Sequence, residues 1–241
     1  MLQPAGSGCF SILKSESRFM ADLRQRRKSV YFYGRRIIMG KKTTKVNSTR
    51  DLMNFEAAKP FIRSCLINES NLRKRQARTF VCADVWKTYF VELPSPKDRR
   101  TVCYIGEELL SRWNKAVDDL DEAAEENEQG SATIVNMAEL LGNLGGRVKM
   151  YMVTNLEGWN GASVILNVSV QNQLSDLFPE GFAILPSSVH EVIAVPLGLA
   201  RGAEIIVKTM NKSYMVAENE LLSDHVFQVQ KGRLTLLEQE R

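Results

Sequence analysis

The residue types that could do chemistry lie close together in one short segment, Pro186-Ser187-Ser188-Val189-His190-Glu191. Ser188 and His190 could act as a nucleophile and its general base, because histidine exchanges protons near neutral pH. Neighbouring side chains of a strand point to opposite faces, so His190 and Glu191 can act together only where the backbone bends. The segment lacks the Gly-x-Ser-x-Gly pattern of a nucleophile elbow.

A structural interpretation of the same segment needs no catalysis. Ser187 and Ser188 can hydrogen-bond the backbone of a turn, and His190 can bond a carbonyl and orient the flanking strands. A polar cluster between two apolar runs must be hydrogen-bonded, because unpaired buried polar groups are costly. We therefore favour the structural interpretation and keep a hydrolase using Ser188, His190 and Glu191 as an alternative.

Metal and cofactor sites are not predicted. His225 follows Asp224 and could approach His190 in space, with Glu191 or Asp224 as a further ligand, but two histidines without a third clear ligand are a poor metal site. The Gly-rich run 142–147 follows a predicted helix and does not link a strand to a helix, as a nucleotide-binding loop does. It is better interpreted as the end of that helix.

The spacing of the four cysteines predicts free thiols, which are typical of proteins in a reducing compartment. Cys9, Cys65, Cys82 and Cys103 have no CxxC spacing and no neighbouring histidine. Such scattered cysteines are typically buried and free. A disulfide between Cys82 and Cys103 is the alternative if their strands pair.

The C-terminal third has the clearest pattern of elements around the polar segment. Two apolar runs, 182–185 and 192–195, predict short core strands on either side of it. Helical spacing predicts helices over 162–178 and 203–210, strand patterns favour 148–154, and Lys231-Gly232 predicts a hairpin over 226–237. This order indicates an α+β fold, a mostly antiparallel sheet with packed helices.

The preceding part of the chain has weaker patterns. Helical spacing over 52–61, around Pro60, precedes a predicted hairpin of strands 79–93 and 101–105. Apolar residues at three- and four-residue steps predict a helix from 106 to 124, with its acidic residues on a solvated outer face. A second short helix is predicted over 134–144.

Charge divides the chain into a basic arm and an acidic body. Residues 1–80 hold 18 Lys and Arg against 5 Asp and Glu, whereas residues 81–241 hold 14 against 23. We predict a disordered, flexible basic arm (1–45), a region of helix, hairpin and acidic helices (46–147) and an α+β domain (148–241). Met39-Gly40 is typical of a bacterial start, which predicts that residues 1–38 are an upstream extension.

A set of residues across the C-terminal half resembles the uncharacterised bacterial domain-of-unknown-function family 5688. The resemblance, which covers about residue 80 to the end, runs through Thr154-Asn155, Gly161-Ala162, 184–193, 211–213 and 222–227, with a further run over 105–113. We call its main polar, Pro and Gly positions the signature residues: Asn155, Gly161, Pro186, Ser187, Ser188, His190, Glu191, Ser223 and Asp224. The resemblance implies a fold and an intracellular location, and no activity.

The predicted function is that of a cytoplasmic, non-catalytic binding or interaction protein with no cofactor. The apolar runs are too short for a membrane span, and no secretory signal is evident. A protein partner is one possibility. Nucleic-acid association through the basic arm is the alternative, since clustered Lys and Arg bind phosphate backbones.

Overall fold

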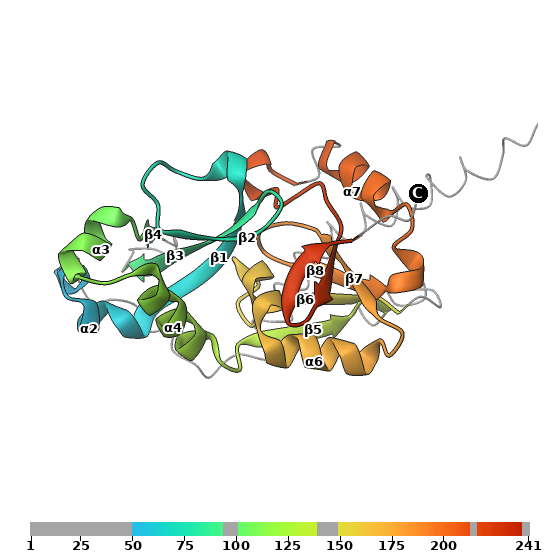
Figure 1. Cartoon of the computed structure of the whole chain (residues 1–241), viewed down its shortest axis with the longest axis horizontal. Helices are drawn as coiled ribbons and strands as arrows, with labels where there is room; N and C mark the ends of the chain where they lie inside the picture. The colour runs from blue at the N-terminus through green and yellow to red at the C-terminus, as the bar shows by residue number, and fades with distance from the viewer. Residues whose placement is uncertain (1–49, 94–100, 139–148, 213–215, 238–241) are drawn as a thin grey trace, which may run out of the picture.

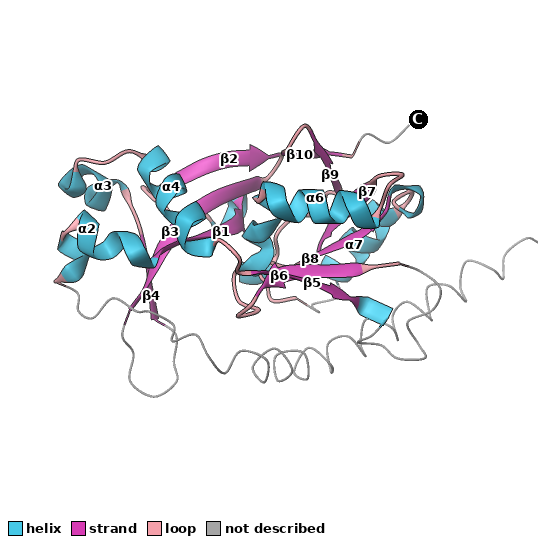
Figure 2. Cartoon of the chain, turned by 90° about the horizontal axis from the view of Figure 1, so that it is seen from below, coloured by secondary structure: helices cyan, strands magenta, loops and turns pink. Residues whose placement is uncertain are grey.

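The structure, a computed structural model, describes residues 50–93, 101–138, 149–212 and 216–237. It contains two antiparallel sheets with packed helices, which confirms the predicted α+β class. Figure 1 shows the two sheets beside each other, and Figure 2 shows α2, α3 and α4 at the end of the molecule that holds β1–β4, away from β5–β10. The predicted arm (1–45), the turn near 94–98 and the Gly-rich run lie outside the described residues.

Sheet one is built from four strands of the N-terminal half. Its strands are β1 (Ile62–Asn68), β2 (Arg78–Cys82), β3 (Val85–Leu93) and β4 (Thr101–Tyr104). The central strand β3 pairs with β1 on one edge and with both β2 and β4 on the other, always antiparallel. The predicted hairpin of β3 with β4 is confirmed.

Three helices cover one face of sheet one. They are α2 (Phe55–Ala58), α3 (Glu107–Trp113) and α4 (Val117–Glu128), with short 3-10 turns at Asp51–Met53, Lys59–Phe61 and Glu69–Asn71. Ile62 of β1 and Tyr89 of β3 are fully buried against Leu120 of α4. Burying such apolar side chains contributes about 1.5–3 kcal/mol each, so α4 is a principal support of this sheet.

Sheet two has six strands in the order β10-β9-β7-β8-β6-β5. They are β5 (Ala132–Asn136), β6 (Tyr151–Asn155), β7 (Phe182–Pro186), β8 (Val192–Pro196), β9 (Phe227–Gln230) and β10 (Arg233–Leu236). The predicted strands on either side of the polar segment are confirmed as β7 and β8. The β9–β10 hairpin is also confirmed; Lys231 and Gly232 both have positive φ, as a two-residue type I′ turn requires.

Helices α6 (Val168–Leu177) and α7 (Ala203–Lys212) pack on opposite faces of sheet two. Ile184 of β7 contacts the cluster that contains Leu174 of α6, whereas its neighbour Ala183 lies in the cluster that contains Val207 of α7. This follows from the alternation of side chains along a strand. Further 3-10 turns lie at Gly161–Leu166, Leu197–Leu199 and Glu218–Glu220.

The two sheets share a core. Leu66 of β1 and Val85 of β3 belong to the same buried cluster as Val153 and Ile165. Strand β5, which precedes the predicted boundary at 147/148, pairs with β6 in sheet two. The chain segment that forms sheet one and its helices therefore ends with α4. The segment that forms sheet two begins directly after it, with β5.

Several predicted elements differ in the structure. The helix predicted over 134–144 is wrong at its start, where β5 runs to Asn136; its apolar residues there belong to a strand. The single helix predicted over 106–124 is two helices, because Asn114 adopts the left-handed conformation and ends α3. The strand predicted over 79–93 is interrupted at Ala83, whose positive φ makes the β2–β3 turn.

The cysteines and the helices bear on two further predictions. Cys65, Cys82 and Cys103 are free thiols, as predicted, and Cys9 lies outside the described residues. None of the helices in the described part of the chain combines the length and apolar composition that a membrane span requires.

Candidate functional site

The predicted polar segment forms an internally bonded turn between β7 and β8. The Ser188 backbone N–H donates to the Glu191 carbonyl (3.1 Å), and the His190 backbone N–H donates to the Ser188 hydroxyl (3.1 Å). The Ser187 hydroxyl donates to the Glu191 carboxylate (3.0 Å). Ser188 is fully buried and Glu191 nearly so. The serines thus hydrogen-bond turn groups that the fold removes from water.

The imidazole of His190 faces two defined partners. Its Nδ1 accepts the backbone N–H of Asn160 at 3.0 Å, so the ring proton of the neutral form lies on Nε2. Nε2 is 3.4 Å from Oε1 of Glu220, which belongs to the 3-10 turn at 218–220. The side chain of His190 is only 16% exposed. His190 therefore joins a loop after β6 to a turn before β9.

Backbone groups of the same turn extend this connection. The Thr154 hydroxyl donates to the His190 carbonyl (2.7 Å), and the Ala162 N–H donates to the Val189 carbonyl (3.2 Å). The Val189 N–H donates to the Glu220 carbonyl (2.9 Å). Strand β6 and the 3-10 turns at 161–166 and 218–220 meet at the turn, and each is held by a hydrogen bond to its backbone.

Gly161 is required by close backbone approach at this point. A Cβ at position 161 would lie 2.4 Å from the Thr154 hydroxyl, 2.5 Å from the Asn155 nitrogen and 2.8 Å from the His190 carbonyl oxygen. Two of these three atoms are backbone atoms that cannot move without breaking the sheet. The absence of a side chain is what lets β6 and the His190 turn meet here.

Asn155 shapes the loop that presents the Asn160 N–H. Its side-chain oxygen accepts the N–H groups of Glu157 (3.1 Å) and Trp159 (3.3 Å), and its amide donates to the Trp159 carbonyl (2.9 Å). Asn side chains stabilise tight loops in this way. Asn160 then adopts the left-handed conformation, which Asn tolerates better than most residues.

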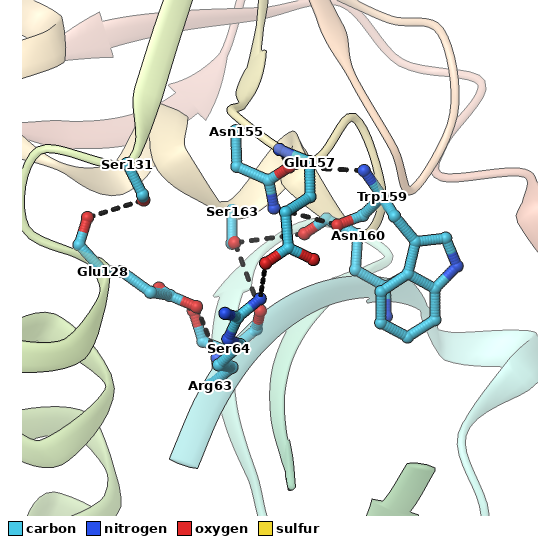
Figure 3. A network of polar contacts seen from close by, with 9 residues as sticks. All are labelled: Arg63, Ser64, Glu128, Ser131, Asn155, Glu157, Trp159, Asn160 and Ser163. Carbon is cyan, nitrogen blue, oxygen red and sulfur yellow. Dashed lines mark hydrogen bonds and ion pairs between the residues drawn. The ribbon is translucent and has the colours of Figure 1, made fainter. Parts of the chain in front are cut away.

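The same loop is bonded to sheet one through a polar network, shown in Figure 3. Glu157 pairs with Arg63 of β1, with 2.6 Å between Oε1 and a guanidinium nitrogen. Both side chains are largely buried, at 17% and 27% exposure. We call the nine residues drawn there the inter-sheet network: Arg63, Ser64, Glu128, Ser131, Asn155, Glu157, Trp159, Asn160 and Ser163.

Glu128, the last residue of α4, occupies the free edge of β1 in this network. Its carboxylate accepts the backbone N–H (2.8 Å) and the hydroxyl (2.9 Å) of Ser64, and the Ser163 hydroxyl donates to the Ser64 carbonyl (3.3 Å). Burial raises the pKa of Glu128, while the bonds from Ser64 act in the opposite direction. Polar side chains therefore cover the edge of β1, which would otherwise present unpaired backbone groups.

The acidic face predicted for the 106–124 helix is only partly solvated. Asp121 of α4 points toward sheet one, where it pairs with Lys87 and accepts the hydroxyl of Tyr89. Burial and the Asp121 carboxylate both raise the pKa of Tyr89. These charged groups connect α4 to β3.

The signature residues near the C-terminus make a second connection between the sheets. The Ser223 hydroxyl donates to the Asp84 carboxylate (2.6 Å) in the β2–β3 turn. Asn68 of β1 donates to the same carboxylate (2.8 Å) and to the Leu222 carbonyl (3.0 Å). Asp224 accepts the side chain of Asn211 on α7 (2.7 Å). Sheet two is thus bonded to both ends of β1.

The structure brings most signature residues together at one place and separates the two histidines. Asn155, Gly161 and the 186–191 turn are neighbours, whereas Ser223 and Asp224 lie at the Asp84 contact. His225 lies 3.7 Å from Glu204 of α7, while His190 lies beside Glu220. Among the described residues, no group of three or more His, Cys, Asp or Glu is arranged to hold a metal ion.

Several residues of this arrangement were not predicted from the sequence. Asp84, Glu128, Glu157 and Glu220 are carboxylates whose partners are distant along the chain, so no local pattern identifies them. Asn160 had a usable signal, since Asn-Gly is a typical left-handed turn pair.

Comparison with known proteins places this two-sheet α+β chain in a family. The model of a family of unknown function, DUF5688, matches residues 29–231. The chain belongs to this family, as the resemblance predicted. The match begins at residue 29, well before residue 80, where the predicted resemblance begins. No curated protein and no solved structure matches the chain.

Proposed function

We propose that the chain is a non-catalytic binding protein that acts in the bacterial cytoplasm. The observation that carries the proposal is the environment of His190, whose two ring nitrogens face Asn160 and Glu220. A general base needs a nitrogen directed at the proton that it removes. The geometry around His190 instead supports a role in holding the 186–191 turn to its neighbours.

The environment of Ser188 supports the same proposal. A nucleophilic serine must reach its substrate, and Ser188 has no exposed surface. Its oxygen accepts the backbone N–H of His190, as the hydroxyl of a serine turn does. These features favour a stabilising role for Ser188 over the alternative hydrolase.

A serine-reactive fluorophosphonate probe tests this proposal directly. We expect the full chain and its Ser188→Ala variant to show the same low labelling. Ser175→Ala, which alters an exposed serine of α6, is the matched control. Labelling that is strong in the native chain and disappears only in Ser188→Ala, with an unchanged circular dichroism spectrum, would overturn the proposal.

The second candidate function is nucleic-acid association. Residues 1–80 carry the large excess of Lys and Arg, and part of that excess lies on the described surface at Arg73, Lys74, Arg75 and Arg78. Phosphate contacts of such residues are salt-dependent. Fluorescence anisotropy at several salt concentrations tests this function, and binding that did not weaken with salt would contradict it.

A further inference from the structure

Sheet one has a second face that helices α2, α3 and α4 do not cover. Tyr89 and Val91 of β3 point into the cluster beneath α4. Because strand residues alternate between faces, Trp86, Thr88 and Phe90 point to the other side. On that side Trp86 and Phe90 contact aromatic side chains from β2, β4 and the 155–160 loop, whereas Thr88 between them is buried and bonded to Gln76. We call its six main residues the aromatic–basic face: Arg73, Arg78, Phe80, Trp86, Tyr104 and Trp159.

One end of this face is an aromatic pair with a cation, in which Phe80 is exposed and Trp86 is half-buried. Phe80 of β2 lies edge-on to Trp86, with 5.2 Å between ring centroids, and Arg78 lies over the Trp86 ring at 5.4 Å. Phe80 is 57% exposed, although it is a large apolar ring in the middle of a strand. Exposed aromatic rings of this kind mark interaction surfaces when polar groups surround them.

The other end repeats the arrangement. The buried ring of Phe90 contacts Tyr104 of β4 (6.2 Å) and Trp159 of the 155–160 loop (5.4 Å), and Arg73 lies 5.5 Å over the Tyr104 ring. Tyr104 and Trp159 are half-buried, so each side chain keeps some accessible surface. Phe90 and Trp86 are four residues apart on β3, so the two ends are about 13 Å apart.

The segment 72–80, which borders this face, is positively charged. Arg73, Lys74, Arg75 and Arg78 are all exposed, and no acidic residue lies within 72–80. Arg75 pairs with Glu108 at 3.4 Å, but both side chains are more than half exposed. Such an exposed pair is weak and can be exchanged for a phosphate.

We propose that the aromatic–basic face binds single-stranded nucleic acid. Unpaired bases stack on exposed aromatic rings, and arginines beside those rings neutralise the phosphates between them. A duplex offers phosphates without free base faces, so it fits this surface less well. Both RNA and DNA single strands have the required chemistry. The inference rests on the proposed role as a binding protein and names the class of ligand.

The test is fluorescence anisotropy with the full chain and labelled oligonucleotides of about 15 nucleotides, poly-dT, poly-rU and a duplex. We expect single strands to bind more tightly than the duplex. Phe80→Ala should weaken single-strand binding by about 5- to 150-fold, the effect of losing one stacked base. Arg78→Ala should also reduce the salt dependence, by about 0.7 in the log–log slope for each phosphate that the variant no longer neutralises.

Matched controls come from the part of the chain that covers sheet two. Val168→Ala removes an equally exposed apolar group from α6, and Arg201→Ala removes an exposed cation near α7. Both should bind like the native chain.

Three results would overturn the inference. The first is that the native chain binds no single strand. The second is that it binds the duplex more tightly than the single strands. The third is that Phe80→Ala and Arg78→Ala both bind as the native chain does. The last result would place the binding elsewhere on the chain. None of them affects the labelling of Ser188, so failure of this inference is distinguishable from failure of the non-catalytic role.

Discussion

The backbone N–H of Asn160 donates to Nδ1 of His190, 30 residues further along the chain, at 3.0 Å. This bond joins the loop after β6 to the turn between β7 and β8. The same loop is paired with β1 through Glu157 and Arg63. A histidine that could have been a catalytic base is therefore linked to the other sheet through a set of structural hydrogen bonds.

Replacing Gly161 with alanine should strongly destabilise the protein. The added Cβ would lie within 3 Å of the Asn155 nitrogen and the His190 carbonyl oxygen, which are backbone atoms of the sheet and the turn. We expect the free energy of unfolding to fall by about 3 kcal/mol or more in urea denaturation. Gly198→Ala is the control, because nothing lies within 4 Å of its added Cβ. Equal stability of the two variants would refute the required close approach.

Ser223→Ala should weaken the connection between Ser223 and the β2–β3 turn. The variant leaves the Asp84 carboxylate with one hydrogen bond fewer in a partly buried site. We expect a loss of about 1–3 kcal/mol in the free energy of unfolding, as for hydrogen bonds to charged groups. Ser175→Ala, on the exposed side of α6, should change the stability by less than about 0.5 kcal/mol. A Ser223 variant as stable as the Ser175 variant would be inconsistent with this second connection.

The stability of the protein should depend on pH through Glu128. Burial raises the pKa of this carboxyl in the folded state, so the folded state favours the protonated form. The favourable contribution is present below the ordinary glutamate pKa of about 4.3 and is lost as pH rises through the raised value. Glu128→Gln keeps an oxygen acceptor for Ser64 and cannot ionise. We therefore expect Glu128→Gln to gain stability relative to the native chain as pH rises from about 4 to 8.

The control for Glu128 is another glutamate of α4. Glu125 is exposed, so Glu125→Gln should follow the native pH profile. Urea denaturation at several pH values measures both differences. A stability difference between Glu128→Gln and the native chain that stays constant across this range would show that Glu128 does not titrate in the folded state as we describe.

Cys65 should resist alkylation in the native protein. It is fully buried, and burial together with the nearby Glu128 carboxylate raises the pKa of its thiol, so the reactive thiolate is scarce. Cys82 and Cys103 are half-buried and should react faster with iodoacetamide, as mass spectrometry of the labelled peptides would record. In urea all three should react. Native labelling of Cys65 at the rate of Cys82 would contradict its placement in the core.

Much of sheet two could be predicted from the sequence because its signals are local. Alternating or apolar runs identified β7 and β8, and Lys231-Gly232 identified the β9–β10 hairpin. Sheet one was harder. Strand β1 lacks a two-residue alternation, because Ser64, Cys65 and Leu66 are buried in succession, and its strand character depends on pairing with β3.

The sequence predicted which segment forms the candidate site, but not which distant residues contact it. Pro186 to Glu191 could be recognised because a polar group between apolar runs is unusual. Glu220, Glu157 and Asp84 contact residues that are far away along the chain, so a pattern of spacing could not identify them. The helix predicted over 134–144 failed for a similar reason, since pairing with β6 determines that Ala132–Asn136 is a strand.

The most direct test of the structural role of the 186–191 turn is the free energy of unfolding of His190→Ala in the full chain. The variant leaves the Asn160 N–H without its acceptor and removes the contact with Glu220. We predict a loss of about 1–3 kcal/mol, the usual effect of leaving a buried donor unpaired. His225→Ala, which alters the more exposed histidine beside Glu204, should lose less than about 0.5 kcal/mol. A His190→Ala variant with the unfolding free energy of the native chain would contradict the account.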